Sequence, residues 1–462
     1  MFEIAIERIK LNYNYQKKSV SDSHTPTLII GAGLTGLSCS IHLKSEHLLV
    51  EAEMEPGGIV RTRIKHGGFY CDGTGHWLHL RNPEMKAMVY DALGENIVEY
   101  TRKARIFSKE VHTLFPFQAN LAGLPNEVVL ECLMGLWKAR HPEDFGVESV
   151  QTPSTSFGES ILRLFGDGIS KHFMTPYNEK LLGVPLTEIS PRYAERFVPK
   201  PSIEDILNGA FGLSKESLGY NATFIYPKTG GIGALPKALE SHFNVKPEYG
   251  IRVTSIDLDA HTAELSDGRT IRYENLVNTM PLANLLKLLG KTPPLIAESA
   301  SKLRATTVHY FDVGVRGPGA AGSDFHWVYF PETEFVFYRV GSYSAVHPDL
   351  SPEGCRSYYV EISGGYEEFR EDLEGLKKRV IQDLIKGGTL STEDEVLFMD
   401  LCEIPFAYVR FDSDYEASRA TVLDELAKHD VQSCGRWGGW NYGGMEDALL
   451  EGRGAAHLID GK

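Results

Sequence analysis

A glycine-rich turn flanked by two short apolar segments constrains the fold of this chain more than any other feature. Residues 27–30 form the apolar run typical of a buried parallel strand, and apolar residues recur at helical spacing between positions 34 and 41. Between these segments lie the three glycines of a GxGxxG pattern, Gly31, Gly33 and Gly36. They allow a tight turn, the approach of a pyrophosphate and close packing of helix on strand. The pattern therefore predicts a dinucleotide-binding β-α-β unit whose helix N-terminus faces the phosphates.

An acidic residue and a pair of glycines follow the predicted helix. Glu51 ends a second apolar strand about twenty residues after the first glycine, where a carboxylate can bind an adenosine ribose hydroxyl. The paired Gly57 and Gly58 resemble the second motif of FAD proteins of the glutathione-reductase type, especially the amine oxidase and protoporphyrinogen oxidase clan, with Ile59 where arginine is frequent. A stretch without side chains lets backbone amides lie against an extended cofactor, and Arg61 can meet its phosphates. We therefore predict FAD as the cofactor.

Length, charge and cysteine usage exclude several classes of protein. The 462 residues suffice for two or three domains, and no apolar run approaches the roughly 20 residues of a membrane span. A formal charge of −15 argues against sequence-independent binding of nucleic acid, because the net field repels a phosphate backbone. The six cysteines show no metal-ligand spacing, so we expect reduced thiols, no metal site and a cytoplasmic location. We interpret residues 1–26 as an N-terminal extension and leave the oligomeric state open.

Two later segments are expected to return to the nucleotide-binding domain. A strand that includes Val253, followed by two strands around an Asp267-Gly268 turn, predicts a hairpin. Near the C-terminus, Gly435 precedes a glycine-rich segment and Met445 begins a predicted helix, whose N-terminal amides could stabilise negative charge on a reduced flavin. We assign Val253, Gly435 and Met445 to the FAD site.

These segments predict an α/β fold with a discontinuous, Rossmann-like FAD-binding domain of the glutathione-reductase type and a mixed α+β substrate domain. The predicted FAD-binding domain comprises residues 27–100, 215–300 and 395–462, and the predicted substrate-binding domain comprises residues 101–214 and 301–394. The segment VVLECLMGLWKA, residues 128–139, is apolar on nearly all sides, so we expect a core helix of the substrate domain.

Seven short motifs occur in the order found in the UDP-galactopyranose mutases, and from about Thr27 to the C-terminus the chain resembles that family, chiefly its eukaryotic-type sequences. The motifs are DGTGH ending at His76, LFPFQANL from Leu114, MTPYNEK from Met174, ERFVP from Glu195, YNATF from Tyr220, FYR ending at Arg339 and GRWGGWNY from Gly435. Each motif is short, and their shared order makes the resemblance specific.

The resemblance implies a redox-neutral flavoenzyme that acts on a nucleotide-linked sugar. In that family the reduced flavin attacks the anomeric carbon and expels UDP, and the sugar ring then opens and recloses with a different size. The resemblance also implies that Arg196 and Arg339 clamp the diphosphate and that His76 lies against the flavin. It assigns the remaining ligand contacts as follows: Tyr408, Tyr442 and Asn221 to the phosphates, and Phe117, Gln118, Tyr177 and Asn178 to the uridine.

Two departures from the family pattern leave the substrate open. Leu182 stands where the family usually has tryptophan, and Val346 stands where it has a tyrosine, with Tyr343 close but out of register. The alternatives are a different sugar or base, a substrate that is not a sugar nucleotide, or an FAD-dependent oxidoreductase of the amine oxidase or protoporphyrinogen oxidase type. The two arginines favour an anionic ligand, whereas amine oxidases need an apolar or aromatic cage. Because no second GxGxxG follows a predicted strand, an external reductant such as NAD(P)H would have to reach the flavin through the substrate pocket.

Overall fold

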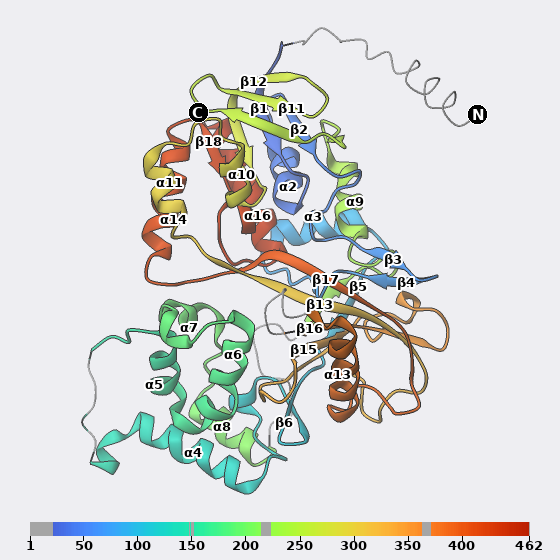
Figure 1. The fold of residues 1–462 in the computed structure, drawn as a ribbon, viewed down its shortest axis with the longest axis vertical. Coiled ribbons are helices and arrows are strands. Elements are labelled where there is room, and N and C mark those ends of the chain that lie inside the picture. The colour runs from blue at the N-terminus through green and yellow to red at the C-terminus, as the bar shows by residue number, and fades with distance from the viewer. Residues whose placement is uncertain (1–21, 147, 149–151, 214–222, 363–370, 462) are drawn as a thin grey trace.

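Two large sheets organise the chain. The computed structural model describes residues 22–146, 148, 152–213, 223–362 and 371–461, and all structural statements concern these residues. Their strands form two seven-stranded sheets and two small two-stranded sheets. In Figure 1 the first sheet and its helices form one end of the molecule, and the helices between residues 126 and 210 form the opposite end. The long strands of the second sheet run between these two ends.

The first sheet contains the predicted β-α-β unit. Its strand order is β10-β11-β12-β1-β2-β9, with β18 beside β12. The register pairs Ile30 in parallel with both Val50 and Asn278, which confirms the predicted buried parallel strand. The strands are β1 (Asp22–Ile30), β2 (His47–Glu51), β9 (Glu248–Tyr249), β10 (Val253–Asp257), β11 (Thr262–Leu265), β12 (Thr270–Asn278) and β18 (Val431–Ser433).

The α-helices lie in three groups (Figure 1). Around the first sheet lie α2 (Leu34–His42), α3 (Pro83–Leu93), α9 (Ala234–Leu239), α10 (Leu282–Leu288), α11 (Pro294–Ala300), α14 (Tyr415–Ala427), α15 (Gly435–Gly438) and α16 (Met445–Asp460). At the opposite end lie α4 (Asn126–Arg140), α5 (Phe157–Ile169), α6 (Thr175–Leu182), α7 (Arg192–Phe197) and α8 (Ile203–Ala210). The helix α13 (Leu373–Lys386) packs against the second sheet.

Helices cover both faces of the first sheet. Leu28 and Leu276 share a core cluster with residues of α10, α11 and α14, whereas Ile29 and Val277 share another with residues of α2 and α16. Because both faces are buried, the central strands read in the sequence as continuous apolar runs rather than as alternating patterns. The carboxyl ends of β1 and β2 consequently open onto the N-terminus of α2, where the predicted nucleotide turn lies.

The second sheet receives strands from three separate parts of the chain. Its order is β17-β13-β16-β15-β14-β6-β7, and β17 pairs in antiparallel with β13. The predicted FAD-binding segment 395–462 therefore contributes one strand to the second sheet, while the division into domains stays a prediction. The strands are β6 (Ala104–Ser108), β7 (Val111–Leu114), β13 (Ala305–Arg316), β14 (Trp327–Tyr329), β15 (Phe337–Ser342), β16 (Cys355–Ile362) and β17 (Glu395–Val409), and the small sheets pair β3 (Arg63–Lys65) with β4 (Phe69–Cys71) and β5 (Val98–Thr101) with β8 (Thr223–Tyr226).

The helix α4 contributes one face to the core, as expected, whereas its opposite face is exposed. Leu130 and Trp137 have exposed fractions of 61% and 49%, whereas Cys132 and Leu136 are buried. The buried face contacts α5 at very short range, because a Cβ on Gly168 would lie 2.4 Å from the Glu131 carbonyl oxygen. Glycine thus brings the two helix backbones together along one side of α4. Among the described residues, no helix is long and apolar enough to cross a membrane.

Candidate active site

The GxGxxG turn forms a surface free of side chains at the end of β1. Gly31 adopts φ +97°, and its amide donates to the Val50 carbonyl at 2.8 Å, which ties the turn to β2. A Cβ on Gly36 would lie 1.9 Å from the Gly31 carbonyl oxygen. Gly33 is the N-cap of α2, and within the described chain no side chain caps that helix. The open helix terminus therefore fits a phosphate group.

The paired glycines return to this turn. Gly57 and Gly58 have φ +120° and +62°, a conformation that favours glycine. The Gly57 amide donates to the Ala32 carbonyl at 2.8 Å, and a Cβ on Gly58 would lie 3.3 Å from the Gly33 Cα. The two predicted glycine motifs thus form one continuous backbone surface, which fits an extended dinucleotide.

Glu51 is held at the edge of this surface. Its Oε2 accepts from the Ala32 amide at 2.7 Å, and its Oε1 accepts from the Glu53 amide at 2.9 Å. Arg61 donates to the Glu55 carbonyl at 2.9 Å and places Nη2 3.8 Å from Glu51 Oε1. The predicted contacts of Glu51 with a ribose and of Arg61 with phosphates stay predictions.

Of the three later residues assigned to the cofactor, two have contacts that place them beside this region, and the third begins a helix that packs against α2. Val253 is buried at the start of β10, just after Ile251, whose amide donates to the Glu51 carbonyl at 2.9 Å. Gly435 adopts φ +81°, and a Cβ there would lie 2.5 Å from Thr35 Oγ1 of α2. Met445 begins α16, as predicted, and α16 packs against α2.

Arg339 of β15 is fixed by a two-pronged ion pair with Glu361 of β16. Its Nε donates to Oε2 at 3.0 Å and its Nη2 donates to Oε1 at 2.5 Å, and Nη2 also lies 3.4 Å from the Tyr408 hydroxyl. Burial alone would lower the pKa of Arg339, but the carboxylate of Glu361, 1% exposed, raises it well above its ordinary value. Arg339 is therefore a permanent cation, and its Nη1 has no hydrogen-bond partner among the described residues.

A second arginine joins this cluster, and the sequence analysis had given it no role. The Arg436 guanidinium lies 4.6 Å from the centre of the Tyr442 ring and 5.7 Å from that of Tyr408. These two rings stack at 5.5 Å, so the predicted phosphate-binding tyrosines do lie together. Arg436 also donates to the Gly443 carbonyl at 2.8 Å. The pattern could have been found from its place between Gly435 and an aromatic-rich segment, since arginine stacks readily on aromatic rings.

His76 lies within the electrostatic range of both cations. Its imidazole is 8% exposed, and within the described chain Nδ1 has no hydrogen-bond partner. Burial lowers its pKa from 6.5 to about 4; the Asp72 and Thr74 backbone oppose this, while Arg436 and Arg339 add to it. His76 is consequently a neutral imidazole near neutral pH.

The residues assigned to the uridine form an aromatic ladder with one unforeseen member. Phe117 stacks on Phe173 at 5.1 Å, and Phe173 stacks on Tyr177 at 5.2 Å. Tyr177 meets Tyr329 edge to face at 5.1 Å. Phe173 precedes the predicted motif by one residue, and its position was visible only in the fold.

The two side-chain amides of the predicted uridine site differ in the hydrogen bonds that they already make. Gln118 is buried; its Nε2 donates to the Pro199 carbonyl at 2.7 Å, whereas its Oε1 has no partner among the described residues. Asn178 donates its Nδ2 to the Met174 carbonyl at 2.7 Å. Contacts of both with a base stay predictions. Arg196 lies in α7, and the structure does not describe its side chain. Asn221 lies outside the described residues.

The departures from the family pattern are core residues in this structure. Leu182, Tyr343 and Val346 are all buried. Tyr343 directs its hydroxyl to Asp312 and to the Thr74 amide, so that this hydroxyl is already engaged. Among the described residues, no group of three or more His, Cys, Asp or Glu side chains could hold a metal ion.

Comparisons with known proteins define the class. The flavin-containing amine oxidoreductase family matches residues 34–460, and the chain belongs to this family. A flavin is therefore its cofactor class. Cyclohexylamine oxidase from Brevibacterium oxydans IH-35A shares the fold, with a TM-score of 0.64, 17% identity and coverage of 94% of this chain and 98% of that one.

Within that class the chain is similar to a UDP-galactopyranose mutase. The crystal structure of the reduced mutase matches with a TM-score of 0.86 and 26% identity, over 95% of this chain and 94% of that chain. The predicted resemblance and the predicted α/β fold are thereby confirmed. Coproporphyrinogen III oxidase of Bacillus subtilis (strain 168) is 21% identical over 301 residues, which cover 60% of this chain and 64% of that protein.

We predict that Glu51→Arg abolishes flavin binding. The substitution removes the acceptor of the Ala32 and Glu53 amides and inserts a cation beside Arg61. Flavin absorbance per protein after purification is the measurement. Glu46→Arg is the matched control, because it makes the same exchange of charge at an exposed position in the loop before β2. Normal flavin content in Glu51→Arg would contradict the assignment of the cradle.

A second prediction concerns pH. Between about pH 7 and pH 5 the unfolded chain protonates His76 near 6.5, whereas the folded chain does not do so until about 4. The unfolded state binds more protons in this window, so His76 lowers the free energy of unfolding as pH falls, by about 2 kcal/mol. Urea unfolding of the wild type and His76→Gln at both pH values should show this difference. A His76→Gln profile parallel to wild type would contradict the buried neutral imidazole.

Proposed function

We propose that the chain is an FAD-dependent enzyme acting on a nucleotide-linked sugar, with the pyranose–furanose isomerisation of the UDP-galactopyranose mutases as the reaction. The observation that carries this proposal is Arg339, a partly buried cation held in one orientation by Glu361 and placed in one cluster with Arg436 and the two stacked tyrosines. Guanidinium groups recognise phosphate through paired hydrogen bonds, and two of them in one cluster favour a diphosphate.

Each part of the site has a separate task in this proposal. Arg339, with Arg196 by the family resemblance, binds the diphosphate, and the Tyr408 and Tyr442 hydroxyls and Asn221 donate to its oxygens. Arg436 contributes a further positive charge. The ladder of Phe117, Phe173 and Tyr177, with Gln118 and Asn178, receives the uridine and excludes water from it.

The chemistry supplied by reduced FAD is nucleophilic attack at the anomeric carbon of the sugar. The protein must then stabilise the departing diphosphate, and the cations of Arg339 and Arg436 meet this need without proton transfer. His76 lies against the flavin in this proposal. Its neutral imidazole adds no third charge to the cluster, so the positive potential stays on the two guanidinium groups.

The oxidoreductase alternative includes two kinds of substrate, which differ in their charge. An amine substrate is a cation, and placing it beside Arg339 and Arg436 would cost several kcal/mol of like-charge repulsion. A porphyrinogen carries carboxylates, which arginine also binds in pairs, and a relative named coproporphyrinogen III oxidase matches part of the chain. A carboxylate-bearing substrate is therefore the second candidate.

Turnover under reducing and aerobic conditions separates these functions. The protein is incubated with dithionite and a panel of UDP-sugars and other nucleotide sugars, and the products are separated. We expect a ring-isomerised sugar nucleotide that forms only under reduction. Oxygen consumption and hydrogen peroxide formation with coproporphyrinogen or an amine, and no isomerised product, would establish the oxidoreductase instead.

Binding of UDP tests the arginine separately from turnover. We predict that Arg339→Ala weakens UDP binding by about 2–5 kcal/mol, because a buried diphosphate loses a charged partner. Arg339→Lys keeps the positive charge opposite Glu361 but loses the planar guanidinium that forms paired hydrogen bonds, so it should also weaken UDP binding. The control is Arg316→Ala, whose side chain is 61% exposed at the far end of β13. Calorimetry gives the affinities, and unchanged affinity in both Arg339 variants would exclude the clamp.

A further inference from the structure

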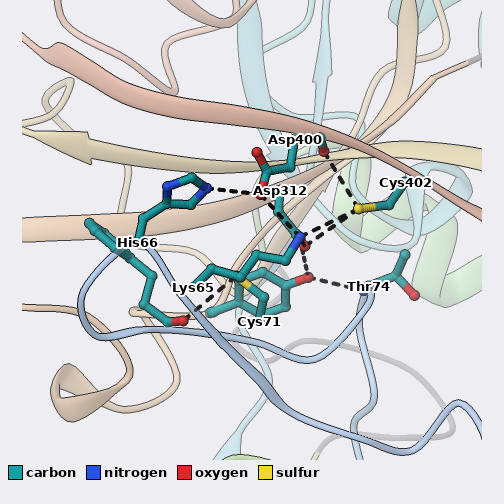
Figure 2. Close-up of polar contacts among 9 residues, drawn as sticks. Lys65, His66, Cys71, Thr74, Asp312, Asp400 and Cys402 are labelled. Carbon is teal, nitrogen blue, oxygen red and sulfur yellow. Dashed lines mark hydrogen bonds and ion pairs between the residues drawn. The ribbon is translucent and has the colours of Figure 1, made fainter. Parts of the chain in front are cut away.

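A chain of polar contacts leads from Lys65 to the loop that carries His76. Lys65 Nζ donates to Asp312 Oδ2 at 2.8 Å (Figure 2). The Tyr343 hydroxyl donates to Asp312 Oδ1 at 2.9 Å and accepts from the Thr74 amide at 3.0 Å. Asp312 and Tyr343 are buried, and the four residues come from β3, β13, the segment after β15 and the histidine loop. One charged side chain is thus connected to one backbone amide of that loop.

The loop is strained at the point where this chain reaches it. Thr74 has φ +86°, a left-handed conformation that a β-branched residue rarely adopts, and Gly73 before it has φ +64°. Such a residue persists only when its surroundings hold it in place. The tyrosine hydroxyl accepts from the amide of this strained residue, two positions before His76. The contact therefore fixes the backbone from which the imidazole projects.

Packing alone leaves one side of this loop open. A cavity of about 450 Å³ lies beside it, lined in part by Lys65, Cys71, Gly73, Asp312 and Cys402. The same cavity is lined by Gly58 and Arg61, which we assign to the cofactor, so the loop borders the predicted flavin site. On the other side, Asp72 anchors the loop by accepting from the Thr62 hydroxyl at 2.6 Å and from the Tyr226 hydroxyl.

Lys65, the first residue of this chain of contacts, has further polar contacts that hold it in place. Lys65 lies 3.3 Å from Asp400 Oδ2 and 3.5 Å from Cys402 Sγ, in addition to its bond with Asp312 (Figure 2). Burial opposes its charge, but Asp312 raises the pKa of Lys65 above its ordinary value. Lys65 is therefore a cation, and it keeps Asp312 oriented as an acceptor for the Tyr343 hydroxyl.

We propose that Lys65, Asp312 and Tyr343 are positioning residues for His76. These three side chains act through the Thr74 amide and set where the imidazole lies relative to the flavin. The proposal rests on the part of the proposed function that places His76 against the flavin. It also gives a role to Tyr343, whose hydroxyl serves the loop rather than the substrate.

Amide exchange tests the tether in the isolated protein. Tyr343→Phe keeps the ring and removes the hydroxyl, so exchange of the Thr74 amide should become at least tenfold faster. Tyr273→Phe is the matched control, because that buried hydroxyl in β12 has no partner among the described residues. Unchanged Thr74 exchange in Tyr343→Phe would overturn the proposal.

The flavin reduction potential tests whether the tether acts through His76. Tyr343→Phe should change the ratio of affinities for reduced and oxidised flavin at least threefold, which is about 14 mV for a two-electron couple. Asp312→Asn should shift the potential in the same direction. The effect of Tyr343→Phe should vanish in a His76→Ala background, and an equal shift in both backgrounds would overturn the proposal. Neither measurement uses a sugar nucleotide, so failure of the wild type to bind UDP would reject the proposed function alone.

Discussion

Two backbone segments meet without side chains between them, and the rest of the nucleotide site depends on this contact. The turn at Gly33 and the loop at Gly57 pair directly, and the Gly57 amide reaches the Ala32 carbonyl. A Cβ on Gly57 would lie 2.4 Å from the Val60 carbonyl oxygen, so no other residue fits there without moving the loop. The same contact brings the segment that follows Glu51 back to the turn. The Glu51 carboxylate accepts from the Ala32 amide of the turn and from the Glu53 amide of that segment. The cradle is therefore a property of backbone geometry, and its only charged members lie at its edge.

The second half of the site is organised by charge. Burying an ion pair rarely stabilises a protein by itself, because desolvation offsets most of the attraction. The Arg339–Glu361 pair is better understood as a device for orientation, since the carboxylate engages Nε and Nη2, and Nη2 also lies 3.4 Å from the Tyr408 hydroxyl. Arg436 is held differently, by aromatic faces and a carbonyl oxygen, neither of which neutralises it. Positive potential consequently remains at Arg436, over the rings of Tyr408 and Tyr442.

The sequence predicted what is local and missed what requires the fold. The β-α-β unit follows from adjacent residues, and only the start of β1 was misjudged: it begins at Asp22, because its early residues pair with β12. Phe173 and Arg436 were missed, since stacking on Phe117 or on Tyr442 joins residues far apart in the chain. The one-sided burial of α4 could not be read from its composition. It depends on glycines of α5, against which the backbone of α4 packs closely. Such a contact produces no periodic pattern in the sequence of α4.

The departures from the mutase pattern change shape and leave charge intact. Leu182 and Val346 stand where the family has aromatic residues, and both are buried, so the smaller side chains alter the packing of the core. The Leu182 carbonyl accepts from the Thr306 hydroxyl, which ties α6 to β13 at this point. The groups that would contact a diphosphate are unaffected by either change. Under the proposed function, the anionic part of the ligand would therefore be constrained more strongly than its sugar or its base, because fixed charges would select the former and the contour of an aromatic wall would select the latter.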